Sequence, residues 1–235
     1  MKTNPALNAL CIVTLVLALT SCNISKKIDK WAGYHYAEKV PTKVKSNDYI
    51  SFKFESTIPD NKVSVTKRTK NQFIPALFYY QWKYETRSTL NVMLPVNNFV
   101  NSFVTAANSK KIKEKLHGAT LKVIINSNPA DFRYNDNGWS VFLIFGAITH
   151  SKIFVEPTSP EFEIQYSIVL PSGESKPKTV SIRNPNRQKE PRFFQSLKGA
   201  VTEYLSVSDA HVKRMGQELA DKIIADLNAI ELVKE

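Results

Sequence analysis

The chain has 235 residues, of which 43% are hydrophobic and 11% aromatic, and its formal net charge at pH 7 is +11. This hydrophobic content excludes an intrinsically disordered chain, and the length suffices for one domain with a sizeable core. The basic balance favours acidic partners, which are nucleic acid, anionic lipid headgroups or acidic glycan; the alternative is a basic surface that is merely solvated.

The amino terminus is organised like a secretory signal peptide. Met1 and Lys2 provide a positively charged start, and the apolar run from Leu10 to Leu19 follows. This run is about half as long as the roughly twenty residues that a membrane-spanning helix needs. A charged start, a short apolar core and small residues before a cleavage site together predict a signal peptide at residues 1–21.

The end of that segment, Leu19-Thr20-Ser21-Cys22, resembles the lipobox of bacterial lipoproteins. The resemblance implies cleavage between Ser21 and Cys22, lipidation of Cys22, and a mature chain that begins at Cys22. The alternatives are an ordinary signal peptide with a chance cysteine, or an uncleaved anchor. Leu19 at position −3 argues against ordinary cleavage, which favours a small residue there.

The cysteine content follows from this interpretation. The chain has two cysteines; Cys11 lies in the segment that is removed, and Cys22 becomes a thioether. The mature domain is therefore expected to have no disulfide, no free thiol and no cysteine-based metal site. Its stability must depend on the hydrophobic core.

Residues 22–46 are predicted to form a lipidated basic tether. Lys26, Lys27 and Lys30 lie close enough to an anionic bilayer to contribute about 1 kcal/mol each. The aromatic residues of this segment either lie at the headgroup level or pack on the folded domain; they are Trp31, Tyr34 and Tyr36. A single globular domain is expected at residues 47–235.

The first half of that domain alternates apolar and polar residues with the period of strands at 50–54, 63–65, 78–84 and 90–94. A helix is predicted next, with Asn97 as its N-cap and apolar residues at helical spacing up to Ala107. A short helical piece at 110–117 follows, and Gly118 is its expected C-cap. This pattern is typical of an antiparallel sheet with one covered face.

The second half is expected to contain strands at 121–125 and 162–170, with 179–183 pairing back as a hairpin. The run 139–155 is either a strand buried on both faces, which we favour, or an exposed apolar loop that meets a partner or membrane. The carboxyl-terminal region is predicted to be helical, with a break near Ser206 and a new helix capped by Ser208. The predicted fold class is α+β: a mainly antiparallel sheet covered on one face by a middle helix and a carboxyl-terminal amphipathic helix.

This arrangement resembles small bacterial envelope lipoproteins that accompany ABC-type or lipid-transport machinery. The resemblance rests on an apolar strand with a glycine loop at 138–146, a strand and turn at 162–173, and a long terminal amphipathic helix at 208–227. It concerns architecture and no catalytic motif, and it implies an accessory role.

The sequence predicts no enzyme, no cofactor and no metal site. It contains no nucleophile elbow, no phosphate-binding loop and no paired-histidine zinc motif. Glu161 and Glu163 share a face of one predicted strand, and Asp131 and Asp136 lie in a polar loop without the spacing of a calcium site. The four histidines are scattered, at His35, His117, His150 and His211.

These observations predict a non-catalytic accessory, assembly or binding component of the bacterial envelope. The lipid on Cys22 would hold it at the outer membrane, facing the periplasm, near an envelope protein partner; nucleic acid is not expected there. One alternative is a module that binds anionic lipid or an envelope polymer, and another is a hydrolase. The candidate basic contact surface is Lys110, Lys111, Lys113 and Lys115.

Overall fold

The computed structural model describes residues 24–44, 47–55, 58–59, 61–127, 130–159, 161–170 and 173–232. The predicted signal peptide 1–21, with Ser21, and the predicted lipidation site Cys22 lie outside the described residues. In chain order the elements are α2 (Ile24–His35), β1 (Ile50–Phe54), β2 (Ser64–Ala76), β3 (Tyr79–Leu90), α3 (Met93–Ser109), α4 (Ile112–Lys115), β4 (Thr120–Ile125), β5 (Phe132–Leu143), β6 (Gly146–Pro157), β7 (Glu161–Leu170), β8 (Gly173–Glu174), β9 (Lys178–Arg183) and α5 (Leu197–Leu232).

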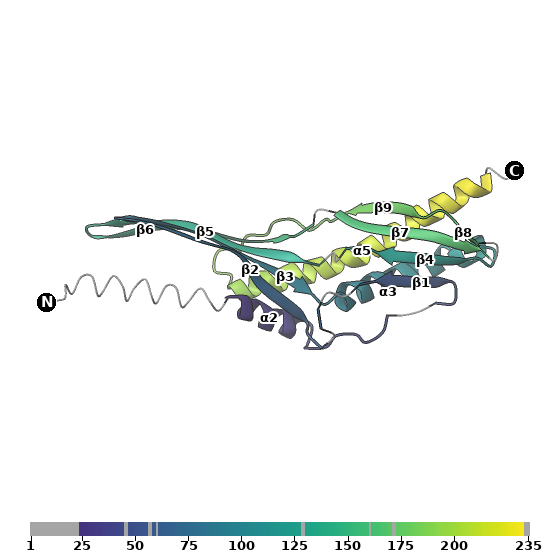
Figure 1. The fold of residues 1–235 in the computed structure, drawn as a ribbon, viewed down its shortest axis with the longest axis horizontal. Coiled ribbons are helices and arrows are strands. Elements are labelled where there is room, and N and C mark those ends of the chain that lie inside the picture. Colours follow the sequence, from purple (N-terminus) through teal and green to yellow (C-terminus); the bar gives the residue numbers. More distant parts are fainter. Residues whose placement is uncertain are drawn as a thin grey trace.

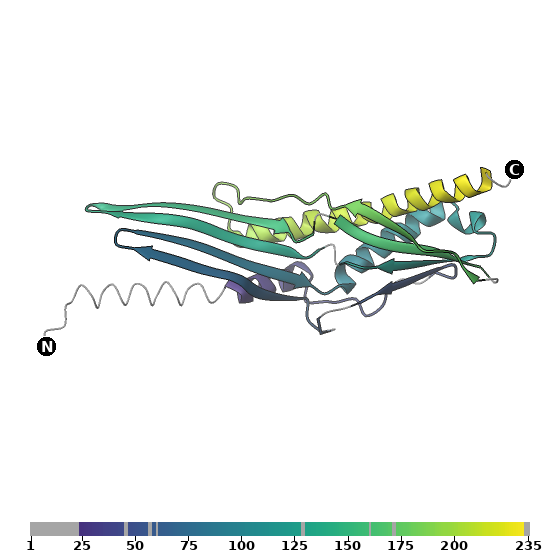
Figure 2. The ribbon, with the colours of Figure 1, turned by 45° about the horizontal axis from the view of Figure 1, so that its top comes forward.

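The strands form two separate sheets. In the first, β1, β4 and β7 are neighbours, and both β8 and β9 pair with β7. Only β1 and β4 are parallel in it. The second sheet has the order β2-β3-β5-β6 and is antiparallel throughout, so it consists of two long hairpins side by side. The hairpins extend from one end of an elongated molecule, and the carboxyl terminus of α5 lies at the other end (Figures 1 and 2).

The predicted α+β class is confirmed, because α3 and α5 pack on the first sheet. Phe99 and Phe103 of α3, Leu121 and Ile164 of the strands, and Met215 of α5 belong to one buried cluster. The two helices approach closely at Gly216, where a Cβ atom would lie 2.5 Å from the carbonyl oxygen of Phe99. This close approach brings α3 and α5 together as one layer over the sheet.

Two predicted helix boundaries are wrong. Helix α3 begins at Met93, four residues before Asn97, and the Oδ1 atom of Asn91 accepts a hydrogen bond from the Met93 backbone N–H at 3.1 Å. Helix α5 is continuous for 36 residues through Ser206 and Ser208. The Ser208 hydroxyl is buried and accepts a hydrogen bond from Asn186 Nδ2 at 3.1 Å, so it packs inside the fold instead of capping a new helix.

The predicted tether is also wrong for residues 24–35, which form a helix within the folded domain. Ile28 and Ala32 of α2 have no exposed surface and belong to a second buried cluster. Asp29 accepts hydrogen bonds from the hydroxyls of Ser64 and Thr66, each at 2.7 Å. The folded domain therefore begins before Asn47, because an amphipathic helix hides its apolar face although its sequence is rich in lysine.

The second cluster joins α2, the base of the second sheet and the first turns of α5. Its members include Phe132 and Tyr134 of β5 and Tyr204 and Leu205 of α5. One helix therefore serves both sheets: the amino-terminal part of α5 covers the base of the hairpins, and the remainder covers the first sheet.

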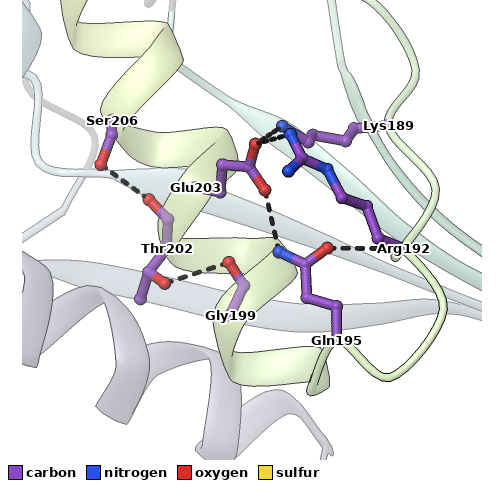
Figure 3. A network of polar contacts seen from close by, with 7 residues as sticks. All are labelled: Lys189, Arg192, Gln195, Gly199, Thr202, Glu203 and Ser206. Carbon is purple, nitrogen blue, oxygen red and sulfur yellow. Dashed lines mark hydrogen bonds and ion pairs between the residues drawn. The ribbon is translucent and has the colours of Figure 1, made fainter.

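A polar network fastens the basic segment 184–192 to α5 (Figure 3). Glu203 of α5 accepts a hydrogen bond from Gln195 at 2.8 Å and pairs with Arg192 at 3.2 Å and with Lys189. The hydrogen bond from Lys189 is the largest of the contacts that lower the pKa of the Glu203 carboxyl. Lys189 also bonds through its backbone to Val155 of β6, so the segment links the hairpin base to the helix.

Candidate functional site

The two hairpins end in adjacent two-residue turns. Leu77 and Phe78 connect β2 to β3, and Ile144 and Phe145 connect β5 to β6. The Phe142 backbone N–H donates a hydrogen bond to the Phe78 carbonyl oxygen at 2.7 Å, so the tips lie side by side. Hairpin turns ordinarily carry Gly, Asn, Asp or Ser, and four apolar residues in this position are unusual.

These turn residues are exposed to solvent. Leu77 is 88% exposed, Ile144 92% and Phe145 99%. Further exposed apolar side chains of the two hairpins are Phe73, Ile74, Phe78, Phe142, Leu143 and Ile148. A contiguous apolar surface of this kind marks a contact with another protein, a ligand or a membrane.

This exposure corrects the favoured interpretation of residues 139–155. The segment comprises most of a hairpin, β5 and β6, and the first seven residues of β6 are exposed. A strand buried on both faces is therefore the wrong description. The reason is that the strands of the second sheet are 12 or 13 residues long and the second cluster covers only their base.

A long uncharged stretch leads to each tip. No charged residue stands between Lys70 and Lys83, and His150 is the one ionisable side chain between Asp136 and Lys152. At about 3.3 Å per residue, seven residues separate Lys70 from Leu77 by roughly 23 Å. Basic residues predominate just behind the stretch; they are Lys67, Arg68, Lys70, Lys83 and Lys152. We call these five residues the basic collar.

An aromatic row runs along one face of the hairpins. The ring centroid of Tyr80 lies 5.5 Å from that of Trp82 and 5.6 Å from those of Phe73 and Phe142. The Trp82 ring packs on Gly138, where a Cβ atom would be 2.2 Å from it, and its Nε1–H donates to Asp136 at 2.8 Å. The row is therefore held in place by its neighbours on the sheet.

A cavity of about 280 Å³ lies where this row meets the helices. Ile24 at the start of α2 and Leu197 at the start of α5 face the strand residues across it. The strand residues that line it include Phe73, Tyr80, Trp82 and Tyr84, with Arg68 and Asp136 as the charged members. Ile24 is two residues after Cys22, so at most about 7 Å of extended backbone separates the predicted lipidation site from the cavity.

The predicted basic contact surface lies on a different part of the fold. Lys110 pairs with Asp221 at 2.5 Å, Lys111 with Glu114 at 3.8 Å, and the Lys113 ammonium lies 5.7 Å from the centroid of the Tyr49 ring. Lys115 also has an interaction within the chain. These lysines follow α3, which runs away from the hairpin tips (Figure 2), so they do not join the tip surface.

The other residues considered for chemistry do not come together. His35 contacts Asp209 at 3.2 Å, His211 contacts Asn186 at 2.7 Å, and the His150 ring stacks on Trp139. Glu161 and Glu163 accept hydrogen bonds from Ser181 and Asn126 respectively. Among the described residues, no group of three His, Cys, Asp or Glu side chains could hold a metal ion.

One carboxylate has an unusual environment at the hairpin base. Asp131 is buried, which raises its pKa to about 6, although a hydrogen bond from Arg87 at 3.2 Å opposes the shift. It lies directly before β5 and far along the strand from the tip. We therefore assign it a role in stability.

No family model, curated protein or solved structure matches the chain. In the part of the chain that the structure describes, no helix is both long and apolar enough to cross a membrane.

Proposed function

We propose that the protein is a non-catalytic lipoprotein of the bacterial cell envelope that is anchored through Cys22 and inserts its two hairpin tips into a lipid bilayer. The observation that carries this proposal is the group of four apolar turn residues at adjacent tips, three of them almost fully exposed. The function of such a component would be to hold its domain at a membrane surface, as an accessory or assembly factor does.

The energetics of transfer support a membrane as the occupant. Burying a Leu, Ile or Phe side chain is worth about 1.5–3 kcal/mol, so four of them contribute roughly 6–12 kcal/mol before the cost of immobilisation. Tyr and Trp side chains are enriched at the headgroup level of membranes. Tyr79, Tyr80 and Trp82 follow the first tip in β3, so they would lie at that level when the tips are inserted.

The sheet edges limit the depth of insertion. Strands β2 and β6 are the two edges of the sheet, and unpaired backbone groups are not tolerated in the hydrocarbon of a bilayer. The tips therefore enter the acyl layer while the strands behind them stay in the hydrated headgroup region. At this depth Lys70 lies roughly 23 Å behind the Leu77 tip, so the attraction between the basic collar and anionic headgroups acts at long range, and salt screens it over about one Debye length, roughly 8–10 Å.

The anchor and the tips belong to the same region of the molecule. Ile24, two residues after Cys22, lines a cavity together with Phe73 and Tyr80 of the hairpins. Acyl chains on Cys22 would start beside the strands that carry the tips, so both attachments can use one membrane. One acyl chain alone gives only marginal binding, and a second attachment makes it stable.

Vesicle flotation tests the proposal in a chain without its signal peptide and with Cys22→Ser, which carries no acyl chain. We expect this chain to float with phosphatidylcholine vesicles that contain phosphatidylglycerol. Ile144→Asp combined with Phe145→Asp should reduce partitioning at least tenfold, because each substitution removes more than about 1.4 kcal/mol of apolar transfer. Leu170→Asp is the matched control, since Leu170 is an exposed apolar residue at the end of β7.

Salt separates this proposal from the alternative of an anionic-lipid or polymer-binding module. Apolar insertion should persist when salt is raised, whereas binding by the basic collar alone should weaken steeply. Equal flotation of the tip variant and the Leu170 control would contradict the proposal.

A further inference from the structure

We propose that the cavity between α2, α5 and the aromatic row is a binding site for a lipid acyl chain. The inference deepens the proposed function, and its assignment of the nearest source of that chain rests on the proposed lipidation of Cys22.

The lining of the cavity selects an apolar ligand. Ile24 and Leu197 form one side, and aromatic rings of β2 and β3 form the other. The charged lining groups already have partners: Asp136 accepts the Trp82 indole N–H, and the Arg68 guanidinium lies 5.7 Å from the centroid of the Tyr84 ring. A polar ligand would have to displace these contacts, while a hydrocarbon chain leaves them in place.

The shape of the surface selects a long and narrow ligand. From Tyr84 the row continues through Trp82 and Tyr80 to Phe142, next to the tips. Tyr84 and Tyr80 are four residues apart on one strand, or roughly 13 Å. The chains of one leaflet span half of a hydrocarbon core of about 30 Å, so one extended acyl chain matches this length.

The site also explains how an acyl chain on Cys22 can reach the membrane. Ile24 lines the cavity with Arg68 and Tyr84 as well as with Phe73 and Tyr80, so the anchor starts beside the row and behind the tips, which alone enter the acyl layer. An acyl chain that lies along the aromatic row would cover the distance between Cys22 and the membrane while staying out of water. Each buried methylene contributes about 0.8 kcal/mol, which favours this path over an exposed one.

Tryptophan fluorescence tests the site, because two of the three tryptophans stand on opposite faces of the same sheet. The third, Trp31, lies in α2 and is replaced by Phe in every protein of this experiment. Trp82 pairs with Gly138, and Trp139 pairs with Gln81 in the next row, so their side chains point to opposite faces. Bromine atoms on an acyl chain quench indole emission on contact. The probe is 9,10-dibromostearate, added without vesicles to the chain that lacks its signal peptide and carries Cys22→Ser.

We expect saturable quenching in this chain, its loss in Trp82→Phe, and its retention in Trp139→Phe. Quenching that does not saturate, or that survives Trp82→Phe unchanged, would overturn the proposal. Because no vesicle is present, this result is independent of tip insertion. The tip variant Phe145→Asp should bind the fatty acid normally, so failure of the site and failure of the proposed function give different patterns.

A charge placed inside the cavity gives a second measurement. Leu197→Glu should weaken fatty-acid binding at least tenfold and leave vesicle flotation by the tips unchanged, while Leu197→Met should preserve both. Unchanged fatty-acid affinity in Leu197→Glu would exclude the space between α5 and the sheet as the site. If this variant does not fold, the comparison of Trp82→Phe with Trp139→Phe still decides.

The lipidated protein identifies the source of the chain. If the chain on Cys22 fills the site, the lipidated protein should show at least tenfold weaker quenching by added dibromostearate than the Cys22→Ser chain. If a membrane lipid fills it, the two proteins should be quenched equally. Both results support an acyl-chain site, and they differ only in its donor.

Discussion

The two sheets of this protein differ in how much of their length the helices cover. Strand β4 of the first sheet alternates buried residues with exposed or partly exposed ones along its whole length under α3 and α5. Strand β6 of the second sheet has seven exposed residues before its buried part begins. Both sheets carry apolar side chains, but only in the first sheet do helices of the same chain bury them. The apolar side chains in the distal part of the second sheet remain exposed, which is why we assign function to this part.

The largest expected effect on stability belongs to the covered sheet. Phe103 of α3 has no exposed surface and contacts the rings of Phe52 and Phe99. Phe103→Ala should lower the free energy of unfolding by about 3–5 kcal/mol, because it removes buried surface and leaves a cavity. Urea unfolding followed by circular dichroism measures this. A loss below about 1 kcal/mol would mean that the first sheet is not the main core.

Asp131 at the base of the second sheet should make the free energy of unfolding depend on pH, whereas the tips should not. Burial raises the pKa of Asp131 to about 6 in the folded state, from 3.8 in the unfolded chain. Between pH 4 and pH 6 the folded state therefore binds the proton more tightly, so the free energy of unfolding falls as the pH rises through this window. The loss of unfolding free energy across this window amounts to about 2–3 kcal/mol and is complete above pH 6.

Urea unfolding at pH 4 and pH 7 checks this, with Asp131→Asn as the variant. The difference between the two pH values should shrink by that amount in Asp131→Asn. Arg87→Gln removes the cation that opposes the shift, so it should move the window to higher pH. An identical pH profile for wild type and Asp131→Asn would contradict the assignment.

Substitution of Gly138 should destabilise the distal part of the second sheet, because the Trp82 side chain packs there. A Cβ atom at Gly138 would lie 2.2 Å from the Trp82 ring and 2.5 Å from the His150 carbonyl oxygen. Gly138→Ala should destabilise the hairpins by about 1–3 kcal/mol and change the emission of Trp82. Gly146→Ala is the matched control, because a Cβ atom there meets nothing within 4 Å. Equal emission spectra in both variants would show that Trp82 does not rest on Gly138.

The sequence predicted the covered sheet better than the uncovered one, for a physical reason. The strand predicted at 162–170 and the helical spacing in α3 both reflect one buried and one exposed face; both elements were confirmed, and the alternation in the strand holds up to Tyr166. The run 139–155 does not indicate which face is buried. An unbroken apolar segment has the same sequence pattern whether the protein itself or a membrane covers it. A sequence signal existed in Leu77-Phe78 and Ile144-Phe145, which stand where polar turn residues are usual.

Other errors arose where the deciding contact is distant in sequence. Ser208 resembles a helix cap, but its hydrogen-bond partner, Asn186, lies 22 residues away. The segment after Cys22 resembles a solvated tether because of its lysines, yet Ile28 and Ala32 form one face at a spacing of four and are buried by elements far along the chain. The cavity beside Ile24 could not be predicted for the same reason, since residues from five separate elements line its wall.

Substitutions at the tips should have the smallest effect on the free energy of unfolding in water. With a membrane present, the same substitutions should change the stability clearly. Phe145 is 99% exposed, so Phe145→Ser should change the free energy of unfolding by no more than about 0.5 kcal/mol.

A membrane that binds only the folded state stabilises it by mass action. Phosphatidylglycerol-containing vesicles should therefore raise the melting temperature of the Cys22→Ser chain and raise it less in the Phe145→Ser variant of that chain. Calorimetry with and without vesicles measures both effects in one series, and Leu170→Ser serves as the control at the other exposed strand end. A vesicle-induced shift that is the same in all three proteins would place the membrane contact away from the tips, and the uncovered part of the second sheet would then need a protein partner.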